Sequence, residues 1–449
     1  MAERPGLGKR QSSNDRGVSP PPSKRKQQST TTSKAVANFF TPASKKEPSK
    51  MSWRIVKNSL LVGRYAPATK IALQDRAKVA AFDFDSTLIT SASGKVFSRD
   101  ASDWKWWHSS VPTTLKRLYE EGYLVAIVSN QGGISLRSDP KTVKSDQKRL
   151  SDFKQKVSAV LSQLDIPCSV YAATSRDQYR KPRTGMWDEL LDEYDLDDVV
   201  DLNNSFFVGD AGGREAIAGG VKDHSCVDRH FAANVGIAFH TPEEYFLQEE
   251  PRPYTRDFDP TVYIGEHEPE LADQSTSASP AFTKRYPLDI VLFCGSPGAG
   301  KSSYYWRNLQ PLGYSRVNQD ILKTREKCIK AATALIQDGT SVVIDNTNAD
   351  PDTRAIWVSL AQKLNVPIRC VLFTAPAKLC EHNDTFRALN VGSETNPESR
   401  SILPKLAFTG FASRYREPKV SEGFAEIIMT EFKFEGSDEQ KRLWSRHWT

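Results

Sequence analysis

The chain has 449 residues, of which 38% are hydrophobic and 26% are charged, a composition typical of a soluble protein with two or three domains. No apolar run approaches the roughly 20 residues that cross a bilayer, and the N-terminus lacks the apolar core of a secretory signal, so we expect neither feature. The formal net charge of the chain is +6, but residues 1–50 hold eleven Lys or Arg against three Asp or Glu, a balance of +8, and the remaining 399 residues sum to −2.

The first 50 residues are rich in Ser, Thr, Pro, Lys and Gln. Such a segment cannot bury enough apolar surface to offset the entropy of ordering, so we predict a disordered basic tail. Its clusters Lys9-Arg10 and Lys24-Arg25-Lys26 are spaced like a two-part nuclear import signal, which predicts a nuclear protein. A solvated basic tail explains these clusters equally well.

An aromatic pair interrupts this tail. Val36 precedes Phe39 and Phe40 by three and four residues, and an exposed aromatic pair indicates a surface that something covers. The pattern resembles the short peptide that docks on the sliding clamp of DNA replication, although Ser33 stands where that motif prefers Gln. The alternative is an incidental apolar spot, or a patch that packs on the protein's own surface.

Residues 51–250 predict a first α/β domain. Short apolar runs of strand length alternate there with amphipathic segments such as 143–164, which favours a parallel sheet covered by helices. The runs are VAAFDFD (79–85), YLVAIVSN (123–130), CSVYAAT (168–174) and NSFFVGD (204–210).

Residues 251–282 are rich in Pro, Glu, Ser and Thr and predict a linker. From residue 283 to 449 the alternation restarts, so the fold class is two α/β domains in tandem, each with a mainly parallel sheet. The apolar runs of this part are LDIVLFCG (288–295), SVVIDNT (341–347) and IRCVLFTA (368–375). The six cysteines form no CxxC pair, so we expect reduced thiols that are mostly buried.

Paired aspartates end the apolar run at residues 79–85. Functional groups gather at the carboxyl ends of parallel strands, where Asp83, Asp85, Ser129 and Asp210 are expected. A carboxylate can attack phosphorus, a second can protonate the leaving alcohol, and Mg²⁺ suits such an anionic site. Two aspartates one residue apart, taken alone, are more often an acidic turn.

The full set resembles the four motifs of the haloacid dehalogenase superfamily. DFDSTLI (83–89), VSNQGG (128–133), RKPRTGMW (180–187) and VGDAGGR (208–214) occur in the family's order. The resemblance implies a Rossmann-like phosphatase in which Asp83 is the nucleophile, Asp85 the acid/base, Ser129 a phosphate ligand and Lys181 a neutralising cation. It also implies a metal held by Asp83, the backbone carbonyl of Asp85 and Asp210. Asp223 and Asp228 both remain candidates for supporting roles.

A second motif, GSPGAGKSS (295–303), follows a predicted strand and precedes a predicted helix. This context is typical of a P-loop, whose backbone N–H groups cradle phosphates, with the lysine on the β- and γ-phosphates and the serine on Mg²⁺. We therefore expect ATP to bind here. The residues expected to hold it are Gly295, Gly298, Gly300, Lys301, Ser302 and Ser303.

Downstream residues favour a phosphotransferase. Asp320 is placed to accept a proton from an attacking hydroxyl, although a helix cap is the alternative. Asp345 and Asn346 end a strand and are candidates for metal-water or substrate contacts. Arg387 is expected on a lid helix, where it could stabilise transition-state charge; its alternative is a surface residue.

Together, and in this order, the motifs resemble the polynucleotide kinase 3′-phosphatase family over roughly residues 55–440. The resemblance implies that 3′-phosphates are removed from DNA ends and that 5′-hydroxyls are phosphorylated from ATP, with Asp320 as the kinase base and Arg387 as the lid arginine. Animal members begin with a forkhead-associated domain, for which 50 residues are too few, so the fungal-type architecture is expected.

Two rival functions stay open, namely repair of RNA ends and a kinase/phosphatase acting on small nucleotides or sugars. For DNA we expect a basic channel and stacking tryptophans, with packing of the tryptophans in a helix over the sheet as the alternative. The channel residues are Arg176, Arg180, Lys181, Arg183 and Arg214, and the tryptophans are Trp104, Trp106 and Trp107.

Overall fold

A computed structural model gives the structure of the chain. It describes residues 50–66, 77–96, 98, 100–136, 143–217, 220–256, 258–264, 282–390 and 398–449, which belong to one unit. The predicted tail up to residue 49, with its basic clusters and with Val36, Phe39 and Phe40, lies outside the described residues, as does most of the predicted linker. The domain boundaries at 50, 250 and 283 stay predictions.

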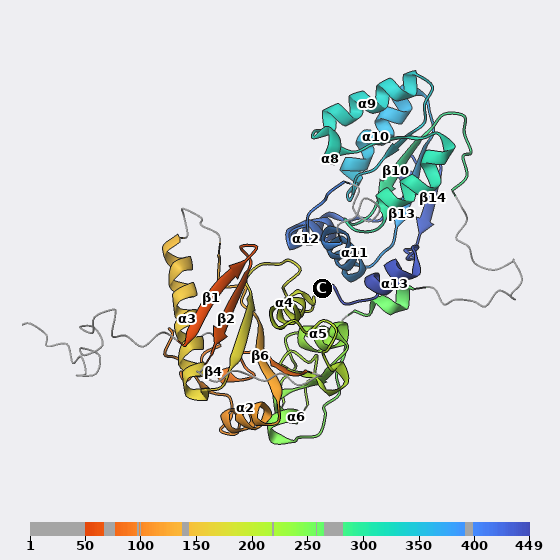
Figure 1. Ribbon diagram of the computed structural model, residues 1–449. Coiled ribbons are helices and arrows are strands. Elements are labelled where there is room, and N and C mark those ends of the chain that lie inside the picture. The colour runs from red at the N-terminus through yellow and green to blue at the C-terminus, as the bar shows by residue number, and fades with distance from the viewer. Residues whose placement is uncertain are drawn as a thin grey trace, which may run out of the picture. The chain divides into compact units, whose positions relative to one another are not determined.

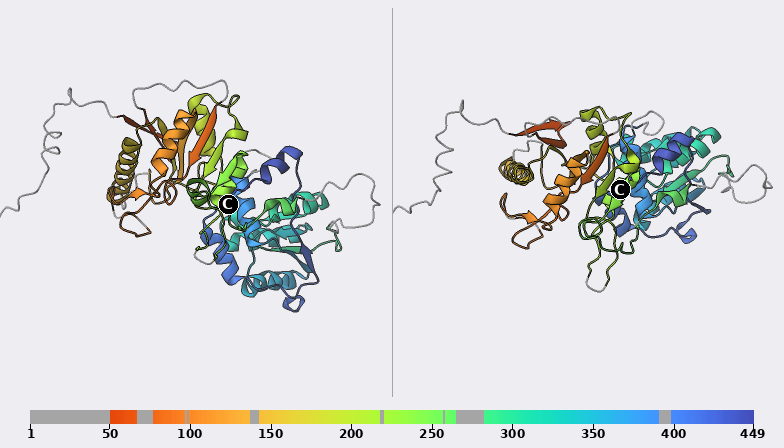
Figure 2. Two further views of the ribbon diagram at one scale, coloured as in Figure 1. Left: turned by 90° about the horizontal axis from the view of Figure 1, so that it is seen from below. Right: turned by 60° about the horizontal axis from the view of Figure 1, so that its bottom comes forward.

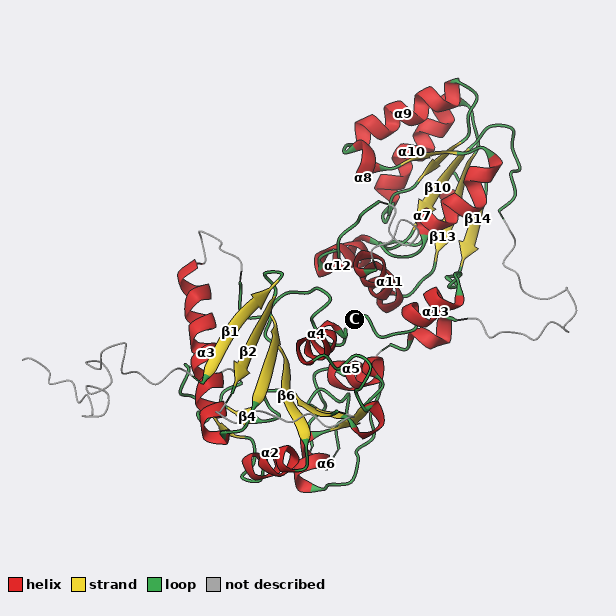
Figure 3. Cartoon of the chain, viewed as in Figure 1, coloured by secondary structure: helices red, strands yellow, loops and turns green. Residues whose placement is uncertain are grey.

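The first half of the chain forms a seven-stranded sheet in the order β1-β2-β7-β6-β3-β8-β9 (Figures 1 and 3). The five adjacent strands β7, β6, β3, β8 and β9 are parallel, and β1 and β2 add an antiparallel edge. The bounds are β1 (Met51–Val56), β2 (Leu60–Tyr65), β3 (Lys78–Phe82), β6 (Tyr123–Asn130), β7 (Cys168–Ala173), β8 (Phe206–Val208) and β9 (Ala238–His240).

Helices cover both faces of this sheet and enclose a separate apolar core on each. On one face, α2, α3 and α6 pack through residues such as Leu115, Val157 and Phe246. On the other, α4 and α5 pack through residues such as Trp187 and Phe231. Because both faces are buried, the central strands are apolar throughout, as the predicted parallel sheet requires. The bounds are α2 (Val111–Glu120), α3 (Val143–Leu164), α4 (Gly185–Tyr194), α5 (Val227–Val235) and α6 (Pro242–Leu247).

Two details of the first sheet differ from expectation. Strand β3 ends at Phe82, so Asp83 and Asp85 lie in the turn that follows rather than on an extended strand. The alternative in which the tryptophans pack in a helix is wrong, because Lys105 and Trp106 form β5 (Lys105–Trp106), which pairs with β4 (Ile89–Thr90) in a two-stranded antiparallel ribbon. Trp104, Trp106 and Trp107 are half-buried against the first core and pack there from an extended segment.

The second half forms a five-stranded, wholly parallel sheet in the order β11-β12-β10-β13-β14. This order confirms the predicted parallel α/β fold. Figure 2 shows its strands and helices from two further directions. The bounds are β10 (Ile290–Cys294), β11 (Ser315–Val317), β12 (Val342–Ile344), β13 (Ile368–Phe373) and β14 (Ile427–Thr430).

Helices again lie on both faces of the second sheet. Residues of α9 and α10, such as Ala332 and Trp357, fill one core, and residues of α11 and α12, such as Cys380 and Phe408, fill the other. The bounds are α7 (Lys301–Tyr304), α8 (Gln319–Leu322), α9 (Arg325–Gln337), α10 (Pro351–Leu364), α11 (Ala377–Leu389), α12 (Lys405–Arg414) and α13 (Asp438–Trp444).

All six cysteines are free and buried, as predicted. Among the helices of the described residues, none combines the length and the apolar character that crossing a bilayer requires.

Candidate active sites

The first candidate site lies where three neighbouring strands of the seven-stranded sheet end. β3 lies between β6 and β8, and Asp83, Ser129 and Asp210 lie at or just beyond the carboxyl ends of these strands. The backbone N–H of Asp83 donates to the carbonyl of Val208 at 2.8 Å, which ties the turn after β3 to β8. The predicted convergence of these residues is therefore present.

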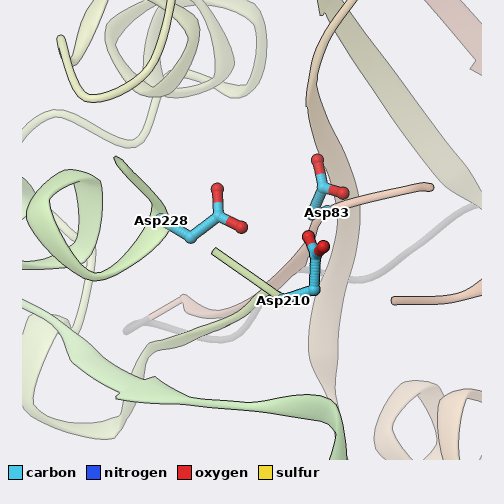
Figure 4. A group of neighbouring side chains, drawn as sticks. All are labelled: Asp83, Asp210 and Asp228. Carbon is cyan, nitrogen blue, oxygen red and sulfur yellow. The ribbon is translucent and has the colours of Figure 1, made fainter. Parts of the chain in front are cut away.

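Three carboxylates face one another in this site. One ligand oxygen from each of Asp83, Asp210 and Asp228 lies within 4.8 Å of the others (Figure 4). Asp228 comes from the first turn of α5, and its Oδ2 accepts the backbone N–H of Ala211 at 3.1 Å. The structure thus selects Asp228 over Asp223 as the third carboxylate. The side chain of Asp85 is outside this group, and the predicted role of its carbonyl stays a prediction.

Lys181 binds two of these carboxylates. Its Nζ lies 2.7 Å from Asp83 Oδ1 and 2.7 Å from Asp228 Oδ1, and the lysine side chain is 1% exposed. The backbone of Lys181 is fixed by Asn130, whose side chain accepts its N–H at 2.9 Å and donates to its carbonyl at 3.1 Å. Burial would lower the pKa of Lys181, but the charges of Asp228 and Asp83 outweigh burial and raise it. The ammonium therefore stays charged.

Asp85 lies at the open side of the site, where it is exposed to solvent. Gln131, which the sequence reasoning missed, donates its amide N–H groups to Asp85 Oδ2 at 2.7 Å and to Ser129 Oγ at 3.0 Å. The protein atoms packed around Asp85 and the charge of Asp83 raise the pKa of Asp85, while the bond from Gln131 lowers it. A raised pKa favours the protonated form that a general acid requires.

The cluster of three carboxylates can bind a divalent cation. Burial, followed by the charges of Asp83 and Asp228, raises the pKa of Asp210 to about 8. A cation placed among the three oxygens would remove this mutual repulsion, and oxygen ligands of this kind are those that Mg²⁺ prefers. Asp83, Asp210 and Asp228 would hold it.

The expected basic channel is only partly present. Arg214 is buried in ion pairs with Asp223 and Glu243, which organise the loop after Asp210. Arg183 is buried as well and donates to the carbonyl of Asp177 at 2.8 Å. Neither guanidinium is free to meet a ligand, so their predicted place in the channel is wrong.

Two arginines of that set stay available. Arg176 is exposed and Arg180 is half-buried, and no acidic side chain pairs with either within the described residues. A Cβ on Gly132, in the loop after β6, would lie 3.1 Å from the guanidinium of Arg180. Burial and the charge of Arg176 lower the pKa of Arg180. An anion bound near this loop would relieve that repulsion.

The second candidate site is the loop after β10. Gly298 and Gly300 have φ angles of +76° and +91°, in the region that favours glycine. A Cβ on Gly298 would lie 2.2 Å from the carbonyl oxygen of Cys380, so the loop can follow this path only with glycine. Lys301 opens α7, and its Nζ donates to the carbonyls of Gly295 at 3.0 Å and Ser296 at 2.6 Å. This is the predicted phosphate-cradling turn.

A cavity of about 1340 Å³ opens beside this loop. The volume exceeds the usual range for one small-molecule site, so the cavity can hold a nucleotide together with part of a second substrate. Its lining includes all of the predicted nucleotide and acceptor residues except Gly295, namely Gly298, Gly300, Lys301, Ser302, Ser303, Asp320, Asp345, Asn346 and Arg387.

Asp320 projects at the rim of this cavity. The cap of α8 is Asn318, whose Oδ1 accepts the backbone N–H of Asp320 at 2.8 Å, so the alternative that Asp320 is itself the cap is wrong. The Asp320 side chain is 73% exposed, which leaves its carboxylate open to a substrate. Asn346 accepts the N–H of Gln319 at 2.9 Å and thereby joins α8 to the end of β12.

Arg387 lies in the last turn of α11, and its side chain is only 24% exposed, so the surface-residue alternative is wrong. Its Nη2 donates to Asp384 Oδ1 at 2.7 Å. Its Nε is buried and has no hydrogen-bond partner among the described residues. Burial lowers the pKa of Arg387, and a bound phosphate would supply the missing acceptor.

Two family models match the chain. The model described as polynucleotide kinase 3 phosphatase matches residues 78–246, and an AAA domain model matches residues 323–409. The first match spans the carboxylate site. The second begins after the P-loop and includes the helix of Arg387.

Three curated relatives extend these matches. The bifunctional polynucleotide phosphatase/kinase of Schizosaccharomyces pombe is 38% identical over 384 residues, which cover 85% of each chain. The polynucleotide 3′-phosphatase ZDP of Arabidopsis thaliana is 35% identical over 41% of this chain and 26% of its own. The polynucleotide 3′-phosphatase of Saccharomyces cerevisiae is 29% identical over 37% of this chain and 87% of its own.

Proposed function

Because the chain belongs to the family of bifunctional polynucleotide phosphatase/kinases, we propose that it prepares broken DNA strands for ligation. It removes 3′-phosphates at one site and phosphorylates 5′-hydroxyls from ATP at the other. The observation that carries the proposal is the presence in one chain of two complete sites, a lysine-bridged carboxylate group and a P-loop cavity.

The contacts of Asp83 and Asp85 support a two-step phosphatase reaction. Lys181 holds Asp83 Oδ1, which leaves the other oxygen to attack phosphorus and form an aspartyl-phosphate. The bond from phosphorus to O3′ breaks, and Asp85, whose pKa is raised, gives its proton to that oxygen. Asp85 then takes a proton from water, which attacks phosphorus and releases phosphate with regeneration of Asp83.

Mg²⁺ at the three carboxylates would screen the anionic substrate from the anionic site and polarise the phosphoryl oxygens. Ser129 and the N–H groups of the loop after β6 would bind the phosphate. Gln131 keeps Ser129 and Asp85 aligned through its two hydrogen bonds.

The kinase reaction uses the P-loop cavity. Lys301, on exchanging its loop carbonyls for phosphate oxygens, neutralises charge on ATP. Asp320 accepts the proton of the 5′-hydroxyl, whose oxygen attacks the γ-phosphorus while the bond to ADP breaks. Arg387 offers its unpartnered Nε to the transferring group.

Arg176 and Arg180 are the proposed contacts for the DNA backbone at the phosphatase site. Both lack an acidic partner within the described residues, and Arg180 borders the loop that binds the terminal phosphate. An Arg180→Gln variant should raise KM for a 3′-phosphorylated oligonucleotide severalfold and leave hydrolysis of p-nitrophenyl phosphate unchanged. Equal effects on both substrates would contradict a backbone contact.

The decisive test uses a nicked duplex with a 3′-phosphate and a 5′-hydroxyl. With ATP and Mg²⁺, the protein should convert it to a substrate that DNA ligase seals. Asp83→Ala should abolish 3′-phosphate release and spare 5′-phosphorylation, and Lys301→Ala should do the reverse. Loss of both activities from either change would contradict two separate sites.

Related assays test two alternative substrates, RNA ends and small molecules. Matched RNA and DNA ends decide whether RNA is the better substrate. A free nucleoside 3′-phosphate that is hydrolysed as well as an oligonucleotide would favour action on small molecules. The names of the relatives refer to polynucleotides, which supports action on nucleic-acid ends rather than on small molecules.

The N-terminal tail supports two further proposals from sequence alone. The clusters Lys9-Arg10 and Lys24-Arg25-Lys26 would direct the protein to the nucleus, and Val36, Phe39 and Phe40 would dock on a sliding clamp. Replacing both phenylalanines with alanine should abolish capture by immobilised clamp and leave both activities unchanged. Retained capture would contradict the docking proposal.

A further inference from the structure

A buried arginine links the residues that are expected to meet the metal of ATP. Arg316, on β11, lies 2.6 Å through Nη2 from Asp345 Oδ2, and its Nε donates to the same oxygen at 2.7 Å. The same Nη2 donates to Ser302 Oγ at 3.0 Å. Ser302 in turn donates its hydroxyl proton to Asp345 Oδ2 at 2.9 Å. The three side chains form a closed triangle of hydrogen bonds.

This triangle sets the direction of the Ser302 hydroxyl. A serine hydroxyl has one proton and two lone pairs. Asp345 takes the proton and Arg316 takes one lone pair, so one lone pair remains for a cation. Without Arg316, the carboxylate of Asp345 would lose its two contacts with the guanidinium and keep the bond from Ser302, so it would hold the proton of Ser302 away from the cation less firmly.

Burial makes the arrangement rigid. The side chains of Arg316 and Asp345 are 6% and 2% exposed, and the guanidinium lies near the rings of Tyr305 and Trp306, at 5.9 and 5.6 Å from their centroids. The planar fork of arginine fixes its partners in direction as well as in charge, which a lysine does not do.

A second nitrogen of the Arg316 guanidinium begins a series of ion pairs that reaches Asp320. Arg316 Nη1 lies 2.5 Å from Glu398 Oε1, and Arg400 Nε donates to Glu398 Oε2 at 2.6 Å. Arg400 Nη2 lies 3.3 Å from Asp320 Oδ2. Charges of alternating sign therefore connect Asp345 to Asp320 through Arg316, Glu398 and Arg400.

We propose that Arg316 is a positioning residue that presets Ser302 and Asp345 for the cation bound with ATP, and that Glu398 and Arg400 extend this setting to Asp320. The inference rests on the proposed kinase function. It implies that residues 398–400 align the general base, Asp320, with the nucleotide.

The test measures ADP binding by titration calorimetry in the full chain, with Mg²⁺ and with EDTA. Arg316→Met should weaken ADP binding in Mg²⁺ by about tenfold or more, because charge-assisted hydrogen bonds are lost, and change binding in EDTA by less than about twofold. Arg316→Lys should fall between Arg316→Met and the wild type. Equal weakening in both media would overturn the proposal, because it would indicate a collapsed P-loop.

Arg369 supplies the matched control. It is also a buried arginine of this sheet, 1% exposed and paired with Asp289 and Glu426. Arg369→Met should destabilise the protein without changing the ratio of the ADP affinities in Mg²⁺ and EDTA. A similar loss of Mg²⁺ dependence in Arg369→Met would overturn the special role of Arg316. A thermal melt of each variant reports whether the chain is folded.

Glu398→Gln tests the series of ion pairs that reaches Asp320. Its ADP affinity in Mg²⁺ should stay within about twofold of the wild type, while kcat for 5′-phosphorylation falls about tenfold, because Asp320 loses its alignment. An unchanged kcat would overturn the link to Asp320. If wild-type ADP binding ignored Mg²⁺ altogether, the proposed kinase function itself would fail, which distinguishes that outcome from failure of this inference.

Discussion

The two candidate sites of this protein keep their shape by different means. In the phosphatase site the side chains hold one another, since Lys181 binds Asp83 and Asp228 at 2.7 Å each and is itself almost fully buried. In the kinase site the backbone supplies the shape, through glycines with positive φ, and the side chains border a cavity of about 1340 Å³. The first site should therefore be sensitive to the loss of one charge, and the second to the gain of one methyl group.

The largest expected effect is from Lys181→Met. Removing the ammonium leaves Asp83 and Asp228 buried without their shared cation, so we expect 3′-phosphatase activity to fall by at least ~1000-fold and stability by about 3–5 kcal/mol. Rates on a 3′-phosphorylated oligonucleotide and a thermal melt measure the two effects. The same change at Lys148, which pairs with Asp152 at the surface, is the control and should alter neither.

Gly298→Ala tests the backbone-built site. The new Cβ would lie 2.2 Å from the carbonyl of Cys380 at a φ of +76°, so we expect ATP affinity to fall by about 100-fold while phosphatase activity is retained. The matched control is Gly339→Ala, where φ is +79° and nothing lies within 4 Å. If both variants bound ATP equally, the close approach to Cys380 would not shape the loop.

A smaller effect is expected from Gln131→Ala. The variant removes the hydrogen bonds to Asp85 and Ser129 but leaves the charged groups in place, so kcat for 3′-phosphate release should fall by about tenfold. Gln155→Ala on α3, where the amide donates to Ser151 Oγ, should have no effect. A loss as large as that of Lys181→Met would mean that neutral contacts hold this site as strongly as charges do.

The smallest expected effect concerns acid stability of the kinase half. His382 is fully buried, and burial lowers its pKa from 6.5 to about 4. Its Nε2 donates to the carbonyl of Trp444 at 2.9 Å, while Nδ1 has no partner among the described residues. The folded protein resists protonation of His382 more than the unfolded chain does. The contribution of neutral His382 to the free energy of unfolding is thus complete above pH 6.5 and is lost as the pH falls toward 4.

The loss amounts to about 1.4 kcal/mol per pH unit within that window. Denaturant unfolding at pH 7.5 and 5.5 measures it, and a His382→Gln variant should show a shallower decline between these values. An identical decline in the variant and the wild type would assign the acid sensitivity to other groups.

The sequence predicted best what depends on position along a strand. Asp83, Ser129 and Asp210 follow apolar runs, and parallel strands bring their ends together whatever the loops do. The P-loop was predicted for the same reason, since its pattern is local and its flanking strand and helix are evident.

Contacts between distant segments were harder to predict. Asp223 and Asp228 are equivalent by spacing, and only the approach of Lys181 from another loop separates them. Arg183 and Arg214 look like DNA ligands in sequence but are consumed by carbonyl and carboxylate partners inside the protein. Arg316 carries no motif, because its role comes from three partners spread from residue 302 to residue 398.

The curl of Lys301 over its own loop has a consequence for small molecules that target the kinase site. The ammonium is satisfied by two carbonyl groups, so a competitor gains from this lysine only the difference between its own acceptors and those carbonyls. Multiply charged phosphate mimics bind the ammonium more strongly than those carbonyls do, whereas neutral ring systems do not. Selective inhibitors of this site should therefore draw their affinity from the aromatic wall around Phe432 and Trp444 rather than from the lysine.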